Sequence, residues 1–168
     1  FTANGSALHI TGNLSLGSGA LAGQPNIRCD VERIFIIGGN LTFRSNFFNI
    51  NNNRCLFIVR GNVTVAPGNT HGVVGMGSST APGYDRIYAY IITDGAFNAD
   101  VDAQHGNNNK FEGLMISGGL VARDLNIRRD LNRQSNALHP AVLIQFDPAY
   151  HFFFREELST REYGVREE

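Results

Sequence analysis

The sequence predicts an all-β fold, a single right-handed parallel β-solenoid followed by a short capping helix. Three observations predict it: a recurring motif of an apolar run and Gly-Asn, alternation of apolar and hydroxyl residues after each pair, and many glycines and asparagines. The motif reads LHITGNLSL at 8–16, FIIGGNLTF at 35–43 and FIVRGNVTV at 57–65. Its spacing, well below the roughly 40–45 residues of a propeller blade, favours solenoid coils of two or three short strands.

We expect about six irregular coils across residues 1–146. Three further apolar runs continue the pattern, at 90–99, 114–122 and 141–146, and Gly95 and Gly118 follow the first two of these runs. The alternating second half of each unit predicts a strand with one buried face. The more continuously apolar first half predicts a strand that is buried on both faces.

The Gly-Asn pairs are predicted to be structural. They are Gly12-Asn13, Gly39-Asn40 and Gly61-Asn62. Glycine allows a tight corner, and equivalent residues of successive coils stack about 4.8 Å apart. An asparagine at the corner therefore reaches the asparagine or the backbone of the next coil. We expect glycine to make each corner and asparagine to tie it to its neighbour.

Cys29 and Cys55 are predicted to form a disulfide, which implies an oxidising compartment. They are separated by about one coil, so they should be neighbours in space. The motif alignment sets Cys55 opposite Arg33, so the bridge should join a loop to a strand edge. The alternative is two buried thiols. Two cysteines are too few for a zinc site, and we expect no metal and no cofactor.

Long segments interrupt the coils at 66–86, 100–112 and 123–140. Residues 147–168 are predicted to form a C-terminal helix, or cap, and a tail. Asp147 is a suitable N-cap and Pro148 a suitable first helical residue. We expect this helix to cover the open end of the solenoid, where strand edges would otherwise be exposed.

The strongest candidates for chemistry are the acids Asp94, Asp100 and Asp102 together with His105. Carboxylates two residues apart on an extended segment point the same way. Paired carboxylates can cleave a glycosidic bond or bind Ca²⁺. The alternative, which we favour, is that these are solvated turn residues and that the protein is not an enzyme.

Two aromatic runs exceed what a small core end needs. They are Phe47-Phe48 and Phe152-Phe153-Phe154. We expect core or cap packing, and the alternative is that some of these rings face outward and form a contact between subunits.

Bulk composition argues against two classes of partner. The formal net charge is −1 and no basic stripe is visible, so we expect no nucleic-acid partner. No run of about 18 apolar residues occurs, so we expect no membrane span. The chain begins with Phe1 and not with methionine, so we expect a processed product or a fragment.

The strings IFIIGGNLTF, LFIVRGNVTV and GLMISGGLVA resemble the coils of bacterial β-solenoid surface proteins. These include bactofilin-like polymer-forming proteins and PilX-like minor components of pilus assembly. The closing stretch HPAVLIQFDPAYHFFFREEL resembles the end of large bacterial cell-surface proteins. The resemblance covers most of the chain, although its interruptions are longer than those of bactofilins. It implies a structural or adhesive extracellular role without catalysis.

The sequence therefore predicts an extracellular or cell-surface module that associates with itself into an assembly or filament. Its expected partner is another copy, with surface polysaccharide as a second candidate. Two alternatives remain. One is a carbohydrate-binding or polysaccharide-cleaving β-helix domain, and the other is a recognition domain of a pilus or larger surface protein, with recognition carried by 66–86.

Overall fold

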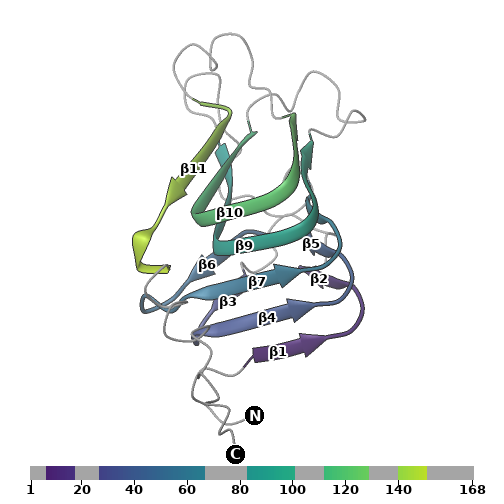
Figure 1. The fold of residues 1–168 in the computed structure, drawn as a ribbon. Helices are drawn as coiled ribbons and strands as arrows, with labels where there is room; N and C mark the ends of the chain where they lie inside the picture. Colours follow the sequence, from purple (N-terminus) through teal and green to yellow (C-terminus); the bar gives the residue numbers. More distant parts are fainter. Residues whose placement is uncertain (1–6, 18–26, 67–82, 101–111, 129–139, 151–168) are drawn as a thin grey trace, which may run out of the picture.

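The computed structural model describes residues 7–17, 27–66, 83–100, 112–128 and 140–150, and these form a parallel β-solenoid (Figure 1). Every strand pairing is parallel, which confirms the predicted fold class. The strands are β1 (Ala7–Ile10), β2 (Leu14–Leu16), β3 (Ile27–Cys29), β4 (Arg33–Ile37), β5 (Leu41–Phe43), β6 (Phe47–Asn49), β7 (Cys55–Val59), β8 (Val63–Val65), β9 (Gly83–Asp100), β10 (Glu112–Arg128) and β11 (Val142–Phe146).

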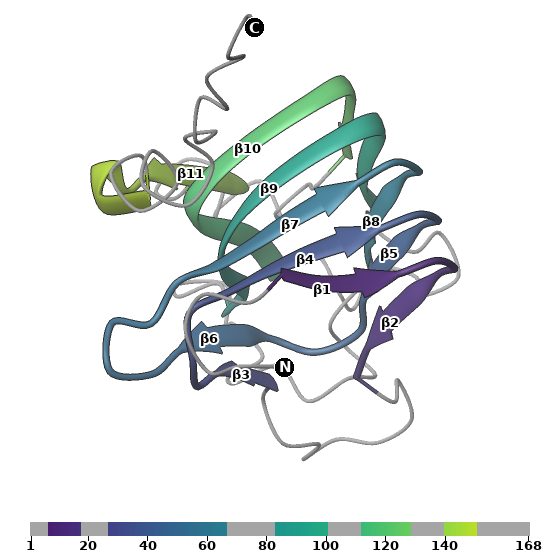
Figure 2. The same cartoon turned by 60° about the horizontal axis from the view of Figure 1, so that its bottom comes forward.

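The strands form three faces, and the chain turns right-handedly from one to the next (Figure 2). The first face contains β1, β4, β7 and the middle of β9 and β10. The second contains β2, β5, β8 and the ends of β9 and β10. The third contains β3, β6, the starts of β9 and β10, and β11. The described strands thus make five coils, one fewer than the motif spacing suggested.

Side chains at equivalent positions stack in columns inside the solenoid. Leu41, Val63 and Phe97 form one such column, and each is 0% exposed. Phe43 and Phe47 pack edge-on against Phe57, with ring centroids 5.5 and 5.3 Å away. Burial of these apolar columns is the main stabilising contribution to the fold.

The first face is apolar on both sides, as its continuous apolar runs predicted. The inward residues of β4 and β7 join the main core, while Ile34 and Leu56 belong to a second, outer cluster. Tyr150 packs into this outer cluster and is fully buried. This explains why the first half of each unit does not alternate.

The predicted register of the last two motif units was wrong. Gly118 lies beside Ala89 on the third face, and not beside Gly95. The fifth copy of the motif is Gly119–Arg128, in which Asp124 stands opposite Ala96. It was hidden because charged residues replace Gly-Asn at its corner, while the run at 114–118 imitates the motif. The run at 142–146 likewise stacks on the third face.

Two boundaries of the predicted interruptions also need correction. Residues 83–86 belong to β9, and residues 123–128 belong to β10, where Leu125 and Ile127 alternate with polar neighbours. The helix begins as predicted, because Asp147 Oδ1 accepts a hydrogen bond of 2.9 Å from the Ala149 N–H. Its described residues, 148–150, do not cover the end of the solenoid; they lie against its side, since the outer cluster needs cover there.

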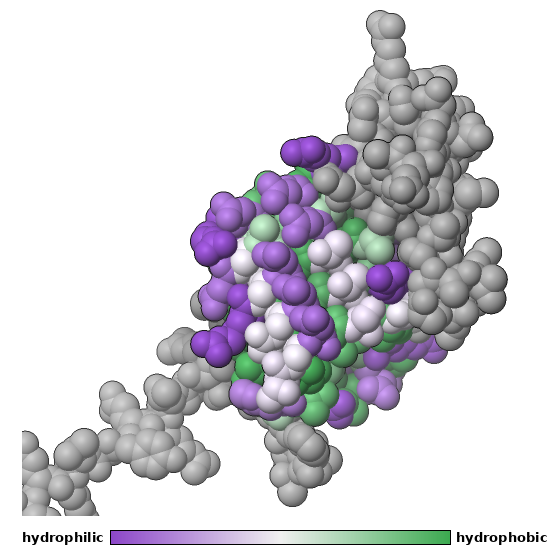
Figure 3. All heavy atoms as spheres, turned by 90° about the vertical axis from the view of Figure 1, so that its right-hand side faces the viewer, coloured by the Kyte–Doolittle hydropathy of each residue, from purple (hydrophilic) through white to green (hydrophobic). Residues whose placement is uncertain are grey.

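The corner between the first and second faces carries a ladder of asparagines. Asn13 Oδ1 accepts a hydrogen bond of 2.8 Å from the N–H of Asn40, and Asn40 Oδ1 accepts one of 2.8 Å from the N–H of Asn62. Asn62 Oδ1 accepts one of 2.9 Å from the N–H of Ala96, where the ladder ends. Figure 3 views the side of this corner and the second face, where rows of hydrophilic side chains run across the coils.

The side chain of each ladder asparagine leaves no room for a side chain at the corner of the next coil, which is why that corner is a glycine. A Cβ on Gly39 would clash with Asn13 Oδ1, and one on Gly61 would clash with Asn40 Oδ1. The carboxamide therefore occupies the space that a side chain would need. Gly12, in the first coil, has nothing within 4 Å of its Cβ position.

We predict that Gly61→Ala lowers the free energy of unfolding by about 2 kcal/mol, because the new methyl overlaps the Asn40 amide and lies 2.7 Å from the Gly39 carbonyl oxygen. Gly12→Ala is the matched control and should change it by less than about 0.5 kcal/mol. Urea unfolding followed by circular dichroism measures both. Equal effects of the two substitutions would contradict the ladder.

Candidate binding site beside the disulfide

Of the acids singled out in the sequence, Asp94 and Asp100 lie in the described part of the chain and are far apart; the pairing of Asp100 with Asp102 stays a prediction. Asp94 is exposed at a corner, and Asp100 ends β9 six residues later. At about 3.3 Å per strand residue these two are about 20 Å apart along the chain, too far for paired acid and base work. Asp102 and His105 lie outside the described residues. Within the described ranges no group of three or more His, Cys, Asp or Glu is placed to hold a metal.

Phe47 does not form a surface contact, contrary to the alternative raised for it. It lies in the core and is 2% exposed. Phe48 points outward but is half-buried, with its ring edge-on to Tyr88 at 5.3 Å between centroids. Phe152, Phe153 and Phe154 lie outside the described residues. In the described part of the chain, no helix is long and apolar enough to cross a membrane.

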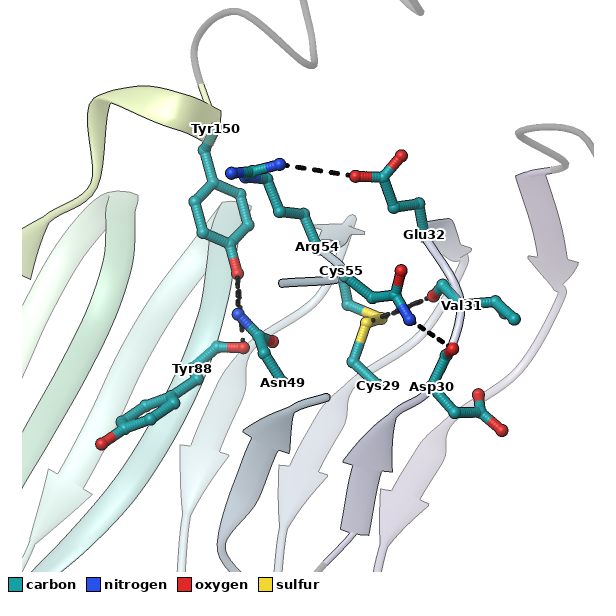
Figure 4. Close-up of a disulfide and its surroundings, with 10 residues drawn as sticks. Cys29, Asp30, Val31, Glu32, Asn49, Arg54, Cys55, Tyr88 and Tyr150 are labelled. Atoms are coloured by element: carbon teal, nitrogen blue, oxygen red, sulfur yellow. Dashed lines mark hydrogen bonds and ion pairs between the residues drawn. A yellow bond between two sulfur atoms is a disulfide. The ribbon is translucent and has the colours of Figure 1, made fainter. Parts of the chain in front are cut away.

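The predicted disulfide is confirmed (Figure 4). It joins the last residue of β3, Cys29, to the first residue of β7, Cys55, with 6.1 Å between the two Cα atoms. Cys55 stands opposite Arg33, as the alignment indicated. Both ends of the bridge lie in strands, so the expected loop partner was wrong. Disulfides persist in oxidising surroundings, and this one indicates such a setting.

A tight asparagine turn follows β6 beside the disulfide. Asn51 and Asn52 have φ angles of 54° and 60°, a left-handed conformation that asparagine tolerates better than most residues. The Asn53 N–H closes the turn on the Ile50 carbonyl oxygen at 2.9 Å. The Asn53 side chain donates to the carbonyl oxygen of Asp30, which ties the turn to the end of β3.

A polar pocket of about 310 Å³ opens between this turn and the start of the helix. It is lined by Asn49, Asn51, Asn52, Arg54, Tyr88 and Asp147. The Arg54 guanidinium lies 3.5 Å from the Glu32 carboxylate and 6.0 Å from the centre of the Tyr150 ring (Figure 4). The ion pair and the cation–π contact together orient this side chain at the pocket.

Tyr150 anchors the start of the helix to the turn. Its hydroxyl accepts a hydrogen bond of 3.0 Å from Asn49 Nδ2 and donates to the Tyr88 carbonyl oxygen at 3.4 Å. Burial raises the pKa of Tyr150 above its ordinary value of 10.0; the Asn49 hydrogen bond lowers it and the nearby Asp147 carboxylate raises it further. The hydroxyl therefore stays protonated at neutral pH.

Two buried polar atoms of the pocket lack a protein partner among the described residues. Asn49 Oδ1 is an acceptor and Arg54 Nε is a donor. Both atoms are closed off from solvent, so a ligand in the pocket would first meet the exposed side chains of Asn51 and Asn52. Asp147, whose carboxylate belongs to the described lining, already caps the helix. The described lining suits binding, and among its residues there is no second carboxylate to pair with Asp147, as glycoside cleavage would require.

Sequence reasoning missed this pocket. Its residues come from β6, the asparagine turn, β9 and the helix start, which are adjacent only in the folded chain. The one signal in the sequence was the Asn51-Asn52-Asn53 run, which indicated a turn and nothing more.

No protein-family model matches the chain, and no match was found among curated proteins or among solved structures. The role of the pocket therefore rests on its own side chains.

We predict that Tyr150→Phe lowers the free energy of unfolding by about 1–2 kcal/mol at neutral pH, because Asn49 Nδ2 loses its buried acceptor. The raised pKa gives wild type a stabilisation that is complete below pH 10 and is lost as pH rises from 10 through the folded-state pKa. Urea unfolding at pH 7 and pH 11 should thus show the gap between the two proteins closing. Tyr88→Phe is the control, and it should lose stability between pH 7 and pH 11 as wild type does. If Tyr150→Phe loses as much stability over this range as wild type, the raised pKa does not belong to Tyr150.

Proposed function

We propose that the chain is an extracellular or cell-surface structural or adhesive module that assembles with copies of itself. The observation that supports this most is that the apolar core columns end in side chains that are at least partly exposed at the terminal coils. In one column, Leu41, Val63 and Phe97 are fully buried, whereas Leu14 in the first coil is half-buried and Leu125 in the last coil is 58% exposed.

A column of the third face behaves in the same way. Phe47, Ile87 and Ile116 are at most 2% exposed, but Ile144 at its end is 43% exposed. Residues of the core pattern are thus left partly in water at the terminal coils. Solenoids need their ends covered, and exposed apolar side chains beside open strand edges favour association. The disulfide supports an extracellular place, and the resemblance to polymer-forming surface proteins supports the structural role.

We predict that the purified protein associates in a concentration-dependent manner. Sedimentation velocity over a wide range of concentrations should show the weight-average sedimentation coefficient rising, and negative-stain electron microscopy should show extended assemblies. Strict monomers at the highest attainable concentration would overturn the proposal. Non-reducing gel electrophoresis is the control for intermolecular disulfides, which association through the solenoid ends does not need because Cys29 and Cys55 are paired within one chain.

A second candidate function is the binding of a carbohydrate, and the polar pocket favours it. Sugar hydroxyls fit a site whose described lining includes three asparagine side chains and one arginine, all of which can hydrogen-bond to hydroxyl groups. The volume of about 310 Å³ is at the lower end of ordinary ligand sites. Binding here does not compete with association through the ends, because the pocket lies on the side of the solenoid.

We predict that a neutral sugar from a panel of hexoses and N-acetylhexosamines shifts the NMR signals of the Asn49–Arg54 turn. Asn52→Gly, which keeps the left-handed backbone and removes the amide, should weaken that binding about tenfold. The matched control is Asn98→Ala on the second face, which should bind as wild type does. If no sugar in the panel perturbs the turn, or if both variants bind equally well, the pocket holds water and not a sugar.

A further inference from the structure

No contact within the described chain requires a glycine at position 12. The corner glycines above it are required because an asparagine of the coil below fills their Cβ space. Gly12 belongs to the first coil, is exposed, and has nothing within 4 Å of its Cβ position. The neighbouring Asn13 N–H has no hydrogen-bond partner among the described residues, whereas the N–H groups of Asn40 and Asn62 are both bonded by the ladder.

The opposite end of the same column carries an acceptor that has no further coil above it among the described residues. Asp124 stands opposite Ala96, in the position that Asn13, Asn40 and Asn62 occupy in lower coils. Its side chain is 60% exposed, and Oδ2 is 3.2 Å from Arg123 Nε. A carboxylate has several acceptor sites, so the contact with Arg123 leaves room for another donor.

Asparagine and glycine are kept or lost together inside the chain. Where a coil has the asparagine, the next coil has the glycine. Above Ala96, which is not an asparagine, the corner lacks the glycine and is one residue shorter, so that Arg123 alone stands opposite Asp94 and Gly95. If this pattern continued beyond the chain, the residue above Asp124 would follow a glycine, and a side-chain acceptor would lie below Gly12. The two unmatched partners lie at opposite ends of one column.

We propose that a second copy of this chain stacks head to tail on the first, with the carboxylate of Asp124 accepting a hydrogen bond from the Asn13 N–H of the next copy beside Gly12. The inference rests on the proposed self-association and names its interface. It brings an anionic side chain to an unpaired backbone donor, which is a favourable pairing.

The apolar columns and the strand direction agree with this register. Continued by one coil, Leu125 would lie against Leu14 and Ile144 against Ile27 of the next copy. A hollow of about 100 Å³ at the first coil, lined in part by Leu16, Ile27 and Phe35, offers space to apolar side chains.

Cysteine cross-linking tests the register. Ser15 and Asn126 are exposed members of one outward column, so the proposed stack sets Asn126 of one copy beside Ser15 of the next. Mixed Ser15→Cys and Asn126→Cys proteins should give a mixed dimer under mild copper-phenanthroline oxidation. Each variant alone should not. Self-linked dimers of either variant, without mixed ones, would overturn the head-to-tail register.

Three variants test the contact itself by sedimentation velocity. Gly12→Ala and Asp124→Ala should each weaken association about tenfold or more, while Asp124→Asn, which keeps an acceptor oxygen, should associate within about threefold of wild type. Thermal unfolding at low concentration checks that the variants fold; should one not fold, the cross-linking result decides. If wild type associates and these variants associate equally well, the stacking is wrong and the proposed assembly stands on another interface. If wild type never associates, both fail.

Discussion

One hydrogen bond, repeated at one corner, sets the register of the solenoid. The side-chain oxygen of Asn13, Asn40 or Asn62 accepts the backbone N–H one coil further on, over 2.8–2.9 Å. The carboxamide sits where a Cβ would be, so the next corner has to be glycine. Because a shift of one residue would turn inward side chains outward, holding this corner also keeps every apolar column in the core.

The corner between the third and first faces is held by different means. There the Cys29–Cys55 bridge and the Asn49–Tyr150 hydrogen bond connect strands that are far apart in the sequence. A disulfide that closes a loop of this length contributes about 3 kcal/mol by limiting the unfolded chain. Because a disulfide and a side-chain hydrogen bond hold this corner, it does not need the same residues in every coil. It therefore has room for an irregular turn and for a pocket, which the regular Gly-Asn corner lacks.

The fold class, the asparagine ladder and the disulfide could be predicted because each leaves a periodic trace in the sequence. The register of the last coil could not, because Arg123-Asp124 replaces Gly-Asn there and LMISGG imitates the motif on another face. Core or cap packing was the expectation for Phe47, but its ring neighbours Phe43 and Phe57, which come from other strands, could not be predicted. The pocket was invisible for the same reason, as its residues meet only after three turns of the chain.

The proposed assembly rests on the terminal coils, where Leu125 and Ile144 of the core columns are exposed in the described part of the chain. Cryo-electron microscopy with helical reconstruction tests this most directly. Five coils at about 4.8 Å each predict an axial rise of about 24 Å per subunit, with all subunits pointing the same way. An assembly with two-fold axes between subunits, or one with a rise unrelated to a whole number of coils, would contradict continuous stacking.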